Sequence, residues 1–210
     1  MEQQIQELVV RRIQYIEYVR RVHSGSLYWL NSVHLSRDDI EAMHYDNNAA
    51  QHLFCLGASL PHMIVSNSTQ STYLRSFLAL MKEYDTFSSA ETTKHRLSGV
   101  GRRFFRTKAK NDKSEESSAP LEFTHLTIYR LPFVPDMYET FGSVCAILVD
   151  AYSKILELPG KAPDSYEMLL KLDERVKRGV LDAFVKDVDA MSKNVVRDEA
   201  MKIESLLVNI

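Results

Sequence analysis

The sequence is poor in cysteine, glycine and proline, and it contains no long apolar run. Two cysteines, Cys55 and Cys145, are too few for the disulfide framework of a small secreted protein. The most apolar stretch, residues 144–149, ends at Asp150 and is far too short to cross a bilayer. The first residues carry no apolar signal segment. We therefore expect a cytoplasmic protein with no signal peptide or transmembrane segment, and peripheral membrane attachment is the alternative.

An excess of charge of either sign is also missing. The chain has 26 basic and 28 acidic residues and a formal net charge of −2, so no global field attracts nucleic acid, and we regard nucleic-acid binding as disfavoured. A hydrophobic content of 45% argues against wholesale disorder. The 210 residues are enough to bury one core.

Apolar residues recur at helical spacing through most of the chain, and the few glycines and prolines fall between these segments. The pattern predicts one long helix over residues 2–33 that bends at Gly25, and a second helix that begins after Ser36 and continues through Leu56. A third follows at residues 73–81, and further helices follow Pro135. We predict an all-α fold: a single domain, residues 1–210, built as an antiparallel bundle of about six helices in two blocks, 2–87 and 121–208.

Between the blocks, over residues 88–120, the periodicity fails, and we expect a long, charged, disordered loop. It contains a cluster of basic and aromatic residues: Arg102, Arg103, Phe104, Phe105, Arg106, Lys108 and Lys110. This cluster fits an anionic membrane surface, although it also fits a phosphate backbone, an acidic protein, or simple packing of the phenylalanines on the bundle. Serines beside Glu115 and Glu116 suggest a phosphorylation switch there.

Two features near the second block stay ambiguous. Residues 121–131 are compatible with either helix or strand. The motif that runs from Pro132 to Pro135 has the spacing of a polyproline ligand. Because Phe133 and Val134 lie inside it and an apolar helix follows, we favour a rigid buried connector.

Residue patterns that would carry catalysis are scarce. The pairs Glu41…His44 and Glu122…His125 have a spacing that occurs in di-iron bundles, but two such pairs are close to chance for seven histidines. No nucleophile elbow and no glycine-rich phosphate loop is present. We therefore predict no catalytic, cofactor-binding or metal-binding residues, no cofactor and no small-molecule substrate. A metal-dependent bundle enzyme is kept as an alternative.

The last segment carries a long apolar stripe that needs a groove in the same chain or in a partner. Its members are Leu169, Leu172, Val176, Val180, Phe184, Val188, Met191 and Val195. We predict that this stripe is a partner interface. The sequence thus favours a non-enzymatic protein–protein interaction module, an adaptor or a subunit of an intracellular regulatory or trafficking complex, with a protein partner or a second copy bound. The alternative is an anionic-lipid binding protein that uses the basic–aromatic loop.

Overall fold

A computed structural model describes residues 2–43, 47–99, 123–160 and 162–208. The described residues form helices α1 (Glu2–His23), α2 (Arg37–Glu41), α3 (Asn47–Ser66), α4 (Gln70–Gly99), α5 (Met137–Glu157), α6 (Ser165–Val176) and α7 (Asp182–Val208), with a π-helical turn, η1 (Lys177–Leu181), between the last two. These residues contain no strand, only one isolated bridge between Trp29 and Val33. The all-α prediction is confirmed. Because α6, η1 and α7 follow one another without a break, the number of separate helices stays near the predicted six.

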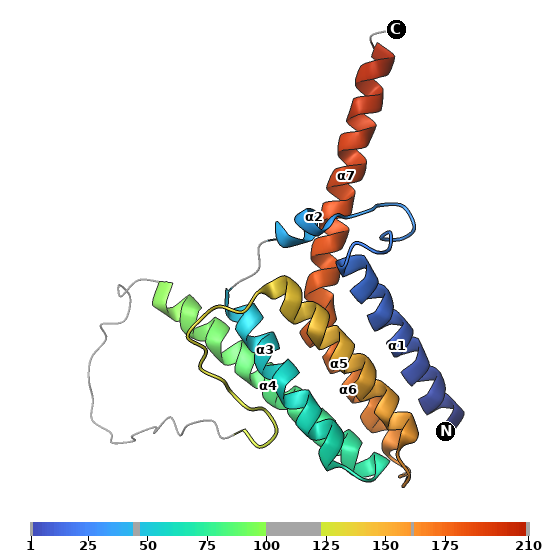
Figure 1. Ribbon diagram of the computed structural model, residues 1–210, viewed down its shortest axis with the longest axis vertical. Coiled ribbons are helices and arrows are strands. Elements are labelled where there is room, and N and C mark those ends of the chain that lie inside the picture. Colours follow the sequence, from blue (N-terminus) through green and yellow to red (C-terminus); the bar gives the residue numbers. More distant parts are fainter. Residues whose placement is uncertain (1, 44–46, 100–122, 161, 209–210) are drawn as a thin grey trace, which may run out of the picture.

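Helices α1, α3, α4, α5 and α6 alternate in direction along the chain, and α7 continues in the direction of α6 (Figure 1). Helix α5 contacts α1 and α3, and α4 packs against α3 and α6. The predicted bundle is therefore present, with one refinement: α3 and α5 are neighbours that run in the same direction (Figure 1). Buried residues from both predicted blocks form a single hydrophobic cluster.

Helix α5 has the spacing that a central helix needs. Its buried residues are Phe141, Val144, Cys145, Leu148, Ala151, Tyr152 and Ile155, which repeat every three or four positions on one face. Helix α3 approaches this face very closely at Gly57, where an added Cβ would lie 3.0 Å from Cγ2 of Val144. The missing side chain is what allows the close contact. Neither Gly57 nor Pro61 ends α3, which continues to Ser66.

The prediction of one bent helix over residues 2–33 is wrong. Helix α1 ends at His23, and Gly25 adopts φ +69° just after it. The amides of Gly25 and Ser26 donate back to the carbonyls of Val22 and Arg21, at 3.0 and 2.9 Å. This is a Schellman stop, in which glycine takes the left-handed conformation that other residues avoid. Helix α2 begins after Ser36 as predicted, and the side chains of Ser36 and Asp39 cap each other's backbone. The predicted continuation of this helix through Leu56 is wrong, because α2 ends at Glu41 and a separate helix, α3, begins at Asn47.

The predicted start of the long loop is also wrong, because α4 continues to Gly99. Amphipathic spacing weakens after residue 87, but a helix already anchored by packing extends without it. The basic–aromatic cluster lies outside the described residues. Of residues 121–131, whose sequence is compatible with helix or strand, the described residues 123–131 are neither. Together with residues 132–136 they form an irregular strap that leads into α5.

A partly buried ion pair joins three helices. Arg12 of α1 donates through Nε and Nη2 to the two carboxylate oxygens of Asp173 in α6, at 2.6 and 2.7 Å. The hydroxyl of Tyr152 in α5 donates to the same carboxylate at 3.1 Å. With its hydrogen bonds satisfied in this way, the charged pair is tolerated in the core and fixes the relative register of α1, α5 and α6.

Candidate interaction site

The predicted partner stripe is occupied by the chain itself. Leu169, Leu172, Val176, Val180, Phe184 and Val188 are buried in the bundle core, and Met191 packs against it. Only Val195, at 37% exposure, is open to solvent. The interface prediction is therefore corrected for the buried members, because the groove that the stripe requires is supplied by the chain's own helices.

The rest of α7 leaves the bundle. Every side chain from residue 193 to residue 207 is exposed, and Figure 1 shows this half of the helix extending well beyond the other helices. We call residues 193–208 the α7 arm. At about 1.5 Å per residue the arm is roughly 24 Å long. It displays the large apolar residues Val195, Val196, Met201, Ile203, Leu206 and Leu207, which are 37–67% exposed.

Four residues of the arm line up along one side: Val196, Ala200, Ile203 and Leu207. We call them the outer stripe. At about 100° per residue, Val196 lies roughly 80° around the helix from Val188, the last fully buried residue. The outer stripe is therefore turned part of the way around the helix from Val188, and Val196 lies about 40° from Ser192, the last buried residue. The 4–3–4 spacing of the outer stripe is visible in the sequence. It is hard to separate from the predicted partner stripe, residues 169–195, because the two stripes overlap on one helix.

A strained loop tip lies at the same end of the bundle. Leu30 and Asn31 have positive φ angles, 48° and 55°, in a tight turn closed by hydrogen bonds between Trp29 and Val33. A leucine in the left-handed region costs free energy, about 1–2 kcal/mol. The turn leaves the side chain of Leu30 66% exposed and that of Tyr28 52% exposed. The loop follows α1 at the end from which the arm projects (Figure 1).

The strap over residues 123–136 is held by side chains of α3 and α4. One carboxylate, that of Glu83, accepts the amides of Thr124, His125 and Leu126, at 2.7–3.0 Å. Ser59 Oγ accepts the amide of Thr127 at 3.0 Å. These hydrogen bonds replace the backbone pairing that an irregular segment lacks.

The end of the strap corrects the buried-connector prediction for the proline motif. Pro135 is buried, but Phe133 and Val134 are 61% and 59% exposed. The proline spacing therefore positions two apolar side chains in solvent, just before the start of α5.

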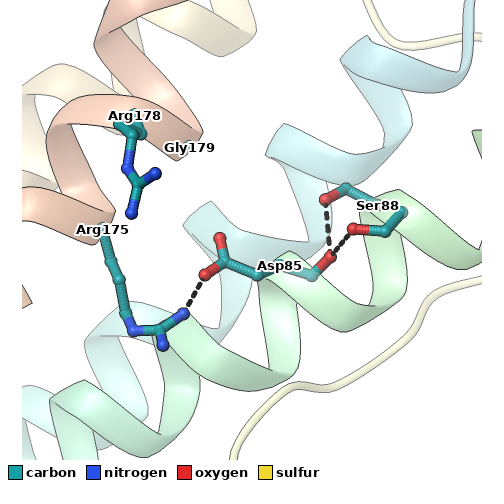
Figure 2. A pocket seen from close by; sticks show the side chains of 6 residues that line it. Asp85, Ser88, Arg175, Arg178 and Gly179 are labelled. Atoms are coloured by element: carbon teal, nitrogen blue, oxygen red, sulfur yellow. Dashed lines mark hydrogen bonds and ion pairs between the residues drawn. The ribbon is translucent and has the colours of Figure 1, made fainter.

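A shallow pocket of about 280 Å³ lies where η1 meets α4. Figure 2 shows Asp85 directed toward Arg175, with Arg178 and Gly179 above. Arg175 forms an ion pair with Asp85, and Arg178 pairs with Glu174 at 3.0 Å. Ser88 and Ser89 donate to the backbone carbonyl of Asp85. Since both guanidinium groups already face carboxylates, the pocket is poorly suited to an anion.

The π-helical turn beside this pocket has a packing explanation. A Cβ on Gly179 would lie 3.3 Å from Oδ1 of Asp85 and 3.6 Å from the ring of Tyr84. The turn thus brings bare backbone against α4. Although π-helical turns are frequent at functional sites, here the geometry serves close helix contact.

Two buried groups with shifted pKa values are unsuited to catalysis. Burial lowers the pKa of His23 to about 4, and the ring is enclosed by Tyr138, Phe141 and Phe184. Burial also raises the pKa of the Cys145 thiol to about 12. A thiolate is the reactive form, so this cysteine is inert packing.

Among the described residues, no three or more His, Cys, Asp or Glu side chains cluster as metal ligands would. Of the two Glu-x-x-His pairs, His44 and Glu122 lie outside the described residues. None of the helices searched in the described ranges combines the length and apolarity needed to span a bilayer. The remaining candidate is the apolar surface at the arm's end of the bundle.

Comparison with protein-family models, curated proteins and solved structures found no match to this chain.

Proposed function

We propose that this chain is a non-enzymatic helical interaction module that binds a protein partner along the α7 arm. The observation that carries the proposal is that the apolar side chains of the outer stripe are all exposed to solvent in a single copy of the chain. An isolated helix of about 16 residues is only marginally stable in water, and its stability normally comes from packing of an apolar face. A partner helix on the outer stripe would supply that packing.

Charge and shape favour a protein partner. The arm carries both signs of charge: Lys202 pairs with Glu199 at 2.7 Å, and Lys193 pairs at 2.6 Å with Asp189, which lies just before the arm. A narrow apolar stripe flanked by mixed charges is the surface of a helix that pairs with another helix. The exposed loop residues Tyr28 and Leu30, at the same end of the bundle, would extend the contact area beyond the arm.

Site-specific photo-crosslinking in living cells tests the proposal. A photoreactive residue is placed at Ala200, on the outer stripe, and in a matched variant at Ser205, which lies about 180° around the helix from Val196. We expect discrete adducts from position 200 and none from position 205, with the adducts identified by mass spectrometry. Equal labelling from the two positions, or no adduct from position 200, would contradict a docking role for the outer stripe.

A further inference from the structure

We infer that the partner of the outer stripe is a second copy of this chain, whose arm pairs with the first in antiparallel orientation. This inference rests on the proposed function of the arm and names its occupant. It comes from the register of the stripe and from the charges on its two flanks.

The spacing of the outer stripe is that of a two-helix seam. Val196, Ala200, Ile203 and Leu207 follow one another at intervals of four, three and four residues. Alternating intervals of four and three residues are those of the heptad repeat, which averages about 3.5 residues over whole heptads and keeps one side of a helix facing a partner helix. Val196 and Ile203 then occupy d positions, and Ala200 and Leu207 occupy a positions.

The flanks of the seam differ in charge. On one flank, at the e positions, lie Arg197 and Glu204, and on the other, at a g position, lies Glu199. Glu199 is paired with Lys202 of its own helix. Within the described residues, no ion-pair partner is found for Arg197 or Glu204, so both charges are available to an approaching helix.

Antiparallel pairing satisfies these charges. If Val196 of one copy packs against Leu207 of the other, and Ala200 against Ile203, the e positions of the two helices face each other. Arg197 of each copy then lies opposite Glu204 of the other. This gives two equivalent arginine–glutamate ion pairs, which are related by the two-fold axis of the dimer.

Parallel pairing does the reverse. In a parallel seam a g residue faces the e residue five positions later on the other helix, so Glu199 would lie opposite Glu204 twice. Like charges at these positions disfavour that orientation. The same residues thus select both the register and the direction of the second copy.

Light scattering after size-exclusion chromatography measures the association of the purified protein. We expect the mass to rise from 24.1 kDa toward twice that value as the concentration increases to about 200 µM, because so short a seam gives weak association. A constant mass of one chain would overturn the inference. Adducts from position 200 to other proteins would still support the proposed function, so the two failures are distinguishable.

Apolar and charge variants then locate the contact. Ile203→Asp should weaken association by more than about 100-fold, since it buries an unpaired charge in the seam. Met201→Asp, on another side of the arm, is the matched control and should leave association unchanged. Because both side chains are exposed in one copy, both variants should fold, as measured by circular dichroism.

The variant Glu204→Arg distinguishes antiparallel from parallel pairing of the two arms. In the antiparallel dimer this change places two arginine side chains opposite each other, so we expect association to weaken about tenfold, and the double variant Arg197→Glu/Glu204→Arg should restore it. In a parallel dimer the same single change would place an arginine opposite Glu199 and strengthen association. Stronger or unchanged association would overturn the antiparallel model. The antiparallel model would also be overturned if photo-crosslinking of the purified protein from position 200 gave only products with the mass of a single chain, because the two copies would then not be joined at this position.

Discussion

His23 shows how one side chain at the end of α1 makes stability depend on pH. The ring is 4% exposed and stacks on Tyr138, with 4.3 Å between ring centroids. Phe141 and Phe184 close the other sides. Such an apolar enclosure disfavours the imidazolium ion, and nearby Arg37 adds to the effect, so the pKa is lowered from 6.5 to about 4.

The lowered pKa of His23 predicts acid sensitivity. Between pH 6.5 and 4 the unfolded chain binds a proton at this site that the folded chain does not, so the free energy of unfolding falls as pH falls. The contribution of neutral His23 to the free energy of unfolding is fully present above about pH 6.5. About 3 kcal/mol of this free energy is lost by about pH 4. We expect His23→Gln to reduce the dependence of the free energy of unfolding on pH, measured by urea unfolding between pH 6.5 and 4. His62→Gln, at an exposed site on α3, should leave it unchanged, and an equal effect from both variants would contradict the assignment.

At the scale of elements, the strap over residues 123–136 depends on α4. The strap has no regular hydrogen bonding of its own, and the Glu83 carboxylate receives three of its amides. A single charged acceptor for successive amides fixes the path of the backbone. This path places Phe133 and Val134 in solvent at the start of α5.

Removing the carboxylate should therefore loosen the strap while the bundle remains folded. We expect Glu83→Ala to lower the free energy of unfolding by about 2 kcal/mol, because three amides lose their acceptor. Hydrogen exchange at Thr124, His125 and Leu126 should accelerate. Glu167→Ala, which removes an exposed pair with Lys171, should cost less than about 0.5 kcal/mol. Unaltered exchange at the three amides would show that Glu83 does not hold the strap.

At the scale of the whole molecule, α7 has two roles divided near Ser192. Residues up to Val188 close the core, and Ser192 is the last buried residue of the described chain. In the arm beyond it, every side chain from residue 193 to residue 207 is exposed within one copy. Its apolar residues would be a liability in solution unless another surface covers them.

Deleting residues 193–210 should consequently leave the stability of a single copy unchanged within about 0.5 kcal/mol, measured by urea unfolding at low concentration. Phe184→Ala, inside the bundle, should cost about 3–4 kcal/mol. At higher concentration the undeleted chain should gain stability through association, and the shortened chain should not. A large loss on deletion at low concentration would mean that the arm is part of the core.

The sequence by itself determined the helical class, because apolar spacing is a local property that each segment carries. It also determined the capped start of α2 at Ser36, since the capping residues are neighbours in the chain. It could not determine where α1 ends or how far α4 extends. Gly25 is compatible with a bend or a stop, and in the structure its positive φ and the hydrogen bonds that Gly25 and Ser26 donate back to α1 make it a stop.

Only the tertiary structure decided which apolar surface is exposed. A stripe has the same spacing whether its groove lies in the same chain or in another, so Leu169 through Val188 were indistinguishable in the sequence from a partner interface. Packing buried them against the chain's own helices and left Val196, Ala200, Ile203 and Leu207 on the arm. The physical reason is that burial depends on contacts between distant segments, whereas periodicity depends only on neighbours.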